Sequence, residues 1–145
     1  MNNINILRFP EMGWTGAAFM SALLLAGCGR GDGIQRVPAS GEVTYGGQPV
    51  LEGQIRFIPQ AGTTGPVTVE KVVDGRYETE TSGGVPVGTH RVEIRAYDPK
   101  VPPPQGPGMP PRPQLLPAKY NAQSVLELTV DSDESRLAHD FHLEP

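Results

Sequence analysis

The sequence has few of the residues on which several classes of protein depend. It contains a single cysteine, so no disulfide bond can form within the chain. Its only tryptophan is Trp14, and the rest of the chain lacks the large ring that stacks well on sugars. Charged residues make up 19% of the chain, with a formal net charge of −4. That balance argues against nucleic acid as a partner, because phosphate binding depends on clustered positive charge.

Long hydrophobic runs are also missing. The apolar segment at residues 16–27 carries no charge, but it has only 12 residues. As a helix it would be about 18 Å long, well short of the roughly 30 Å of a bilayer's hydrocarbon core. Such a length is typical of the hydrophobic region of a signal peptide rather than of a permanent membrane span.

The end of this apolar segment contains the one cysteine. Residues 25–28, Leu-Ala-Gly-Cys, resemble the bacterial lipobox. The resemblance implies cleavage between Gly27 and Cys28 and attachment of lipid to the Cys28 thiol, so that residues 1–27 are a lipoprotein signal peptide. Residues 28–36 would then be the lipidated cysteine and a flexible tether. We expect an exported lipoprotein anchored to a membrane of the bacterial cell envelope; the alternative is an ordinary secretory signal with an incidental cysteine.

Glycine and proline are abundant, at 18 and 16 residues, which is typical of short strands joined by tight turns. Gly46-Gly47 and Asp74-Gly75 are the clearest turn signals, the second being the stronger hairpin signal. No segment after the leader keeps a helical period, so we expect almost no helix. Apolar and polar residues instead alternate in seven short segments: 43–45, 54–58, 67–73, the segment between the turns at 74–75 and 82–84, 89–97, 126–130 and 137–143.

The alternation predicts which side chains form the core. Ile55 and Phe57 should point inward, with Arg56 outward between them. In the same way, the segment 89–97 should direct Val92, Ile94 and Ala96 inward and Arg91, Glu93 and Arg95 outward. Seven strands with one polar face each predict a two-sheet β-sandwich over residues 37–145.

Short motifs across residues 37–145 resemble a known family. Residues 41–50 and 53–59, the Val-Asp-Gly-Arg-Tyr of residues 73–77 and residues 87–94 look like carboxypeptidase-regulatory-like domains. Residues 116–121, Leu-Pro-Ala-Lys-Tyr-Asn, resemble a segment of short lipoproteins of the planctomycete type. The resemblance implies a seven-stranded, transthyretin-like (Ig-like) β-sandwich. It implies no activity.

No set of residues predicts catalysis, a metal site or a cofactor. The transthyretin-like fold also contains a hydrolase family that ends in Tyr-Arg-Gly-Ser, whereas this chain ends His142-Leu-Glu-Pro145, which makes that activity the least favoured. We expect His90 and His139 to be half-buried near strand ends, and His142 to point away from His139. The acidic residues 131–134 are expected to form a solvated turn.

The proline-rich segment from Asp98 to Pro117 is the least routine feature of the sequence. Consecutive prolines favour the extended polyproline II conformation, which other proteins bind in aromatic grooves. The alternative is a crossover between strands that proline stiffens and that binds nothing. The candidate partner-binding residues are Pro102, Pro103, Pro104, Pro110, Pro111, Arg112 and Pro113.

Together these features predict a non-catalytic lipoprotein, not an enzyme, that presents its β-sandwich for protein–protein interaction or scaffolding. The expected partners are the membrane, through the lipid, and an envelope protein. A carbohydrate- or cell-wall-binding module that recognises an envelope polysaccharide is the alternative. The lack of tryptophan after the leader weighs against it.

Overall fold

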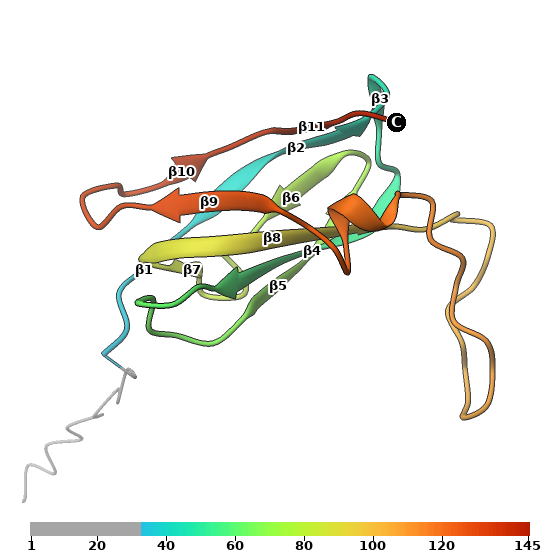
Figure 1. The fold of residues 1–145 in the computed structure, drawn as a ribbon, viewed down its shortest axis with the longest axis horizontal. Helices are drawn as coiled ribbons and strands as arrows, with labels where there is room; N and C mark the ends of the chain where they lie inside the picture. Colours follow the sequence, from blue (N-terminus) through green and yellow to red (C-terminus); the bar gives the residue numbers. More distant parts are fainter. Residues whose placement is uncertain (1–32) are drawn as a thin grey trace, which may run out of the picture. The chain divides into compact units, whose positions relative to one another are not determined.

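A computed structural model describes residues 33–145 (Figure 1). The predicted signal peptide, its cleavage site and Cys28 lie outside the described residues. No helix in the part of the chain that the structure describes is both long enough and apolar enough to cross a membrane.

The described residues are all-β, as the sequence predicts, with one turn of 3₁₀ helix and no α-helix. The elements are β1 (Arg36–Val37), β2 (Ala39–Tyr45), β3 (Gln48–Pro49), β4 (Glu52–Pro59), β5 (Thr68–Val73), β6 (Arg76–Glu78), β7 (Val85–Pro86), β8 (Gly88–Ala96), η1 (Ala118–Tyr120), β9 (Leu126–Val130), β10 (Leu137–Ala138) and β11 (Phe141–Leu143). The sequence predicts seven strands, and residues 33–145 contain eleven. Three additional strands have two residues each, and the last predicted strand is divided into β10 and β11.

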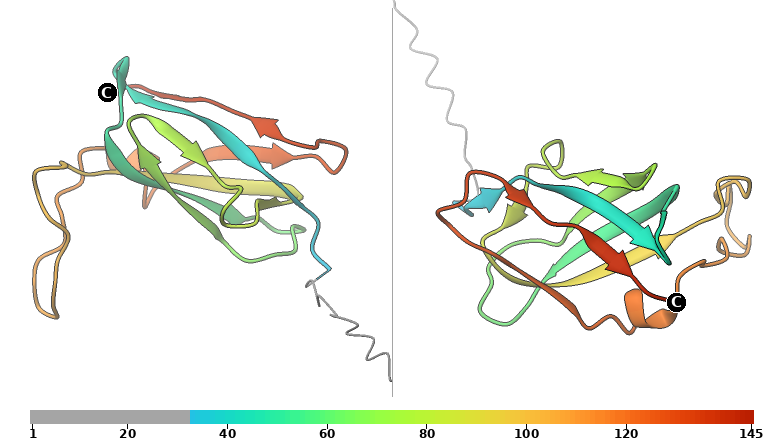
Figure 2. Two further views of the ribbon diagram at one scale, coloured as in Figure 1. Left: turned by 180° about the vertical axis from the view of Figure 1, so that it is seen from behind. Right: turned by 90° about the horizontal axis from the view of Figure 1, so that it is seen from above.

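The main sheet has the strand order β10-β2-β6-β5-β4-β8-β9, and β11 and β3 also pair with β2. Neighbours from β2 to β9 are antiparallel, whereas β10 and β11 run parallel to β2. A second, two-stranded sheet pairs β1 with β7. The antiparallel sheet curls, so that β2, β6 and β11 lie over β4 and β8 (Figure 2). This arrangement is consistent with a β-sandwich.

The core lies between the two halves of this curled sheet. Aromatic side chains from three strands connect the halves: the rings of Phe57 and Tyr77 are 5.9 Å apart, and those of Tyr77 and Phe141 are 6.0 Å apart. The inward positions predicted on β4 and β8 are confirmed, since Ile55, Phe57, Val92 and Ile94 are fully buried and Ala96 nearly so. Burial of these apolar side chains is the main force that stabilises the sandwich.

Both predicted turns are confirmed. Gly46 and Gly47, between β2 and β3, have φ angles of 57° and 77°. Asp74 and Gly75, between β5 and β6, have φ angles of 49° and 79°. Two successive residues with positive φ match the right-handed twist of the flanking strands, which explains the preference for glycine and aspartate here.

The proline-rich segment forms a long loop between β8 and η1 that projects from one end of the domain (Figure 1). The turn between β9 and β10 lies at the opposite end. Where the loop returns, the Leu115 N–H donates to the Ala96 carbonyl at 3.1 Å, and Leu116 is buried. The base of the loop is therefore attached to the domain.

Candidate functional site: the proline-rich loop and the arginine cluster beside it

Arg112 fastens the proline-rich loop to the sheet. Its Nη1 and Nη2 both donate to the carboxylate of Glu52 at the start of β4, the second at 3.1 Å, and Nη2 also donates to the Asp98 carbonyl. The guanidinium lies over the Tyr97 ring, with its carbon 4.8 Å from the ring centre. Only 8% of the Arg112 side chain is exposed. A bidentate contact between arginine and a carboxylate fixes the orientation of the guanidinium as well as its position.

Arg112 and Glu52 each stabilise the ionised form of the other. The hydrogen bond from Arg112 lowers the pKa of the Glu52 carboxyl, and burial opposes that effect only in part. The same hydrogen bond raises the pKa of Arg112. Both groups are therefore ionised near neutral pH, which favours the attached position of the loop. The Nε–H of Arg112 is buried without an acceptor among the described residues.

A hollow of about 490 Å³ lies between the loop and the end of β8. We call it the loop pocket. Proline rings and the Tyr97 ring give it a largely apolar wall, and several polar side chains reach it. Its lining residues are Arg95, Tyr97, Pro103, Pro104, Pro111, Arg112, Gln114 and Asn121.

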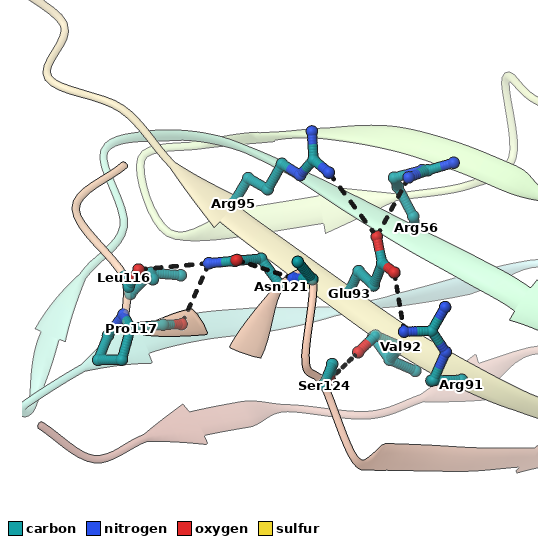
Figure 3. A network of polar contacts seen from close by, with 10 residues as sticks. Arg56, Arg91, Val92, Glu93, Arg95, Leu116, Pro117, Asn121 and Ser124 are labelled. Carbon is teal, nitrogen blue, oxygen red and sulfur yellow. Dashed lines mark hydrogen bonds and ion pairs between the residues drawn. The ribbon is translucent and has the colours of Figure 1, made fainter. Parts of the chain in front are cut away.

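Asn121, which follows η1, is fully engaged in holding the backbone (Figure 3). Its Nδ2 donates to the carbonyls of Leu116 and Pro117 at 3.3 and 3.1 Å, and its Oδ1 accepts from the Ala122 N–H at 2.7 Å. Asn121 therefore fixes the return of the loop and shapes the pocket wall.

An arginine cluster lies on the outer face of β4 and β8 (Figure 3), and one of its members, Arg95, also lines the loop pocket. It consists of Arg56, Arg91 and Arg95 around the carboxylate of Glu93. The nitrogen-to-oxygen distances to Glu93 are 3.1 Å from Arg56, 2.9 Å from Arg91 and 4.0 Å from Arg95. The Glu93 side chain is 7% exposed, and the arginines are 32–36% exposed. One carboxylate thus faces three guanidinium groups, which leaves an excess of positive charge on this face.

The predicted partner-binding residues separate into two groups. Pro103, Pro104, Pro111 and Arg112 line the loop pocket. Pro102, Pro110 and Pro113 lie exposed on the loop and do not line it. Arg112 also holds the loop to the sheet through Glu52, a structural role that the sequence did not predict.

Sequence reasoning did not select Arg95 and Tyr97 as site residues, although the alternation on β8 directs Arg95 outward. The sequence does not show where the loop lies, and in the structure the loop folds back beside these two residues. That position depends on Arg112 and Glu52, which are 60 residues apart in the sequence.

The histidines lie apart from this surface. His90 is fully buried rather than half-buried as predicted, because it lies on the inward face of β8 together with Val92 and Ile94. His139 is half-buried, with its ring 4.7 Å from that of Phe141, and His142 is exposed. Within residues 33–145, no group of three or more His, Cys, Asp or Glu side chains is placed to hold a metal ion. Asp131, Asp133 and Glu134 are exposed.

No protein-family model, curated protein or solved structure matches this chain.

Proposed function

We propose that this chain is a non-catalytic lipoprotein of the bacterial cell envelope that binds another protein through its proline-rich loop. The observation that carries the proposal is the attachment of the loop base: Arg112 binds Glu52, the Asp98 carbonyl and the Tyr97 ring, so the exposed loop is presented at a defined place on the domain. Attachment of both ends and the restricted φ angle of proline reduce the conformational entropy that the loop loses when a partner binds it. The loop also exposes apolar side chains to solvent, with Met109 55% exposed and Leu115 53% exposed.

The membrane attachment in this proposal rests on the lipobox-like residues 25–28. A lipid on Cys28 would place the domain at a membrane surface outside the cytoplasm. Replacing Cys28 by Ser should abolish lipidation and move the protein from the detergent phase to the aqueous phase in phase partitioning. Unchanged partitioning would contradict the proposed anchor.

The proposed fold type is the transthyretin-like sandwich. Two findings support it: the motif resemblance over residues 37–145 and the curled antiparallel sheet with strand order β10-β2-β6-β5-β4-β8-β9.

The alternative, binding of a glycan, has weaker support. Tyr97 is the aromatic side chain of the loop pocket, and the Arg112 guanidinium covers one face of its ring. The Asn121 amide is already engaged with Leu116, Pro117 and Ala122. Both side chains are thus used to hold the loop.

Site-specific photocrosslinking tests the proposed function in the living envelope. A photoreactive residue is placed at Gln105 in the exposed loop of the full-length protein, and in a matched control at Glu134, which is exposed in the turn at the opposite end. We expect a discrete protein adduct from position 105 and none from position 134. Adducts from neither position, or equal adducts from both, would refute a binding role for the loop.

A further inference from the structure

We infer that the loop pocket and the arginine cluster together bind an extended peptide segment in which an acidic residue stands two positions from a large apolar residue. This inference rests on the proposed function and names the chemistry of the partner. It combines two neighbouring features, an apolar pocket and a positively charged face, that share the side chain of Arg95.

The spacing of the peptide follows from β8. Arg95 lies on the outer face of this strand, between the buried Ile94 and Ala96. Tyr97 follows the end of β8, and its N–H donates to the Glu52 carbonyl at 2.8 Å, so extended geometry continues through it. Side chains two residues apart on an extended chain are separated by about 6.6 Å. In an extended peptide that lies along β8, side chains two residues apart have the same spacing. One of them can therefore contact Arg95 while the other enters the pocket beside Tyr97.

The acidic residue is inferred from the charges around Arg95. Its guanidinium is 4.0 Å from the Glu93 carboxylate, the longest of the three contacts in the cluster, because Arg56 and Arg91 lie closer to the same group. Arg95 therefore keeps donors that a partner's carboxylate can use, and a guanidinium binds a carboxylate through two parallel hydrogen bonds. Other charges on this face are Lys71, two strands away on β5, and Glu127, which pairs in register with Arg91. Glu52 on β4 lies on the same face, and its charge is compensated by Arg112.

The local charge also opposes the charge of the whole protein. The chain has a net charge of −4, whereas three arginines around one glutamate leave a local excess of two positive charges. An acidic segment is attracted to this face and a basic segment is repelled by it.

The apolar residue is inferred from the pocket wall. Pro103, Pro104 and Pro111 present rings without hydrogen-bond donors, and the Tyr97 ring lies among them. A hollow of about 490 Å³ with this lining favours an aromatic or branched aliphatic side chain over a polar one. Arg112 and Asn121 hold the two arms at the base of the loop, so the part of the wall that they form is in place before the peptide arrives.

The test uses a displayed library of random heptapeptides, selected on the full-length protein in detergent. We expect enrichment of peptides with Asp or Glu two positions from Phe, Trp, Leu or Ile. The affinity of one enriched peptide is then measured with the wild type, with Arg95→Gln and with the control Arg76→Gln. Arg76 forms an exposed ion pair with Glu42, away from the loop pocket.

Arg95→Gln should weaken binding of the enriched peptide by about tenfold, corresponding to about 1.4 kcal/mol, whereas Arg76→Gln should leave it unchanged. A peptide with Gln in place of its acidic residue should bind the wild type and Arg95→Gln equally. No enrichment, enrichment without an acidic residue, or equal effects of the two substitutions would overturn the inference. Sedimentation without and with the enriched peptide shows whether a second copy occupies the pocket: a dimer that the peptide dissociates would also overturn the inference.

Failure of this inference is distinguishable from failure of the proposed function. If position 105 crosslinks to a protein while the selection yields no acidic motif, the loop binds a partner but the chemistry inferred here is wrong. If position 105 yields no adduct, the proposed function itself is wrong.

Discussion

Burial of His90 makes the stability of this domain depend on pH in a range where most of its other side chains do not titrate. The His90 side chain is fully buried on β8, its Nδ1 lies 3.1 Å from the Gly88 carbonyl, and its Nε2 has no hydrogen-bond partner. Burial lowers the pKa of His90, and the contact with Gly88 opposes that shift only in part. The folded protein therefore keeps His90 neutral at a pH where the unfolded chain binds a proton.

The sign and the size of the effect follow from proton linkage. A histidine in an unfolded chain has a pKa of about 6.5, so below that pH the unfolded state binds more protons and the free energy of unfolding falls. One proton limits the slope to about 1.4 kcal/mol per pH unit. If His90 stays neutral in the folded state throughout, the free energy of unfolding should be about 1.4 kcal/mol lower at pH 5.5 than at pH 7.5.

Urea unfolding of the wild type and of His90→Leu between pH 7.5 and 5.5 measures this effect. Leucine keeps the site apolar and removes the titrating group, so the variant should lose less stability over this range than the wild type. The matched control is His142→Leu, which makes the same substitution at an exposed histidine on β11 and leaves His90 in place. Equal slopes for the wild type and His90→Leu would show that burial does not hold His90 neutral, and would refute the reasoning.

Three further substitutions test the core, the strand packing and the loop attachment. Phe57→Ala, at a fully buried position, should reduce the free energy of unfolding by about 3–5 kcal/mol in urea titrations. Gly41→Ala should cost at least about 2 kcal/mol in the same assay, because its Cβ would lie 1.9 Å from the His139 carbonyl oxygen, which accepts from Tyr77; an unchanged midpoint would contradict this contact. Arg112→Gln should speed hydrogen exchange of the Leu115 amide, at the loop base, and leave that of Ile94 unchanged; equal exchange of Leu115 in both proteins would contradict the role of Arg112.

The sequence predicted the strands where side-chain alternation and burial coincide. On β4 and β8 the alternation is regular, and each inward residue predicted there is buried. The last predicted strand is different, because its alternation continues through a break. At that break the Asp140 carboxylate accepts the Glu42 N–H at 2.7 Å, and this side-chain contact separates β10 from β11. Alternation does not distinguish a side-chain acceptor from a backbone acceptor.

The candidate site was predicted least completely because it depends on contacts between distant residues. The sequence indicated an extended proline-rich segment, but its prolines alone do not fix where that segment lies. One buried arginine supplies that information, through Glu52 on β4 and through the Asp98 carbonyl at the opposite arm of the loop. Protonation of Glu52 removes the charge from one of the three contacts of Arg112, whereas loss of Arg112 removes its contacts with Glu52, with the Asp98 carbonyl and with the Tyr97 ring together. Acid weakens the contact between Arg112 and Glu52 as the pH falls through the lowered pKa of Glu52, so the loop base should be held more firmly at neutral pH than in acid, and hydrogen exchange of the Leu115 amide measures the difference.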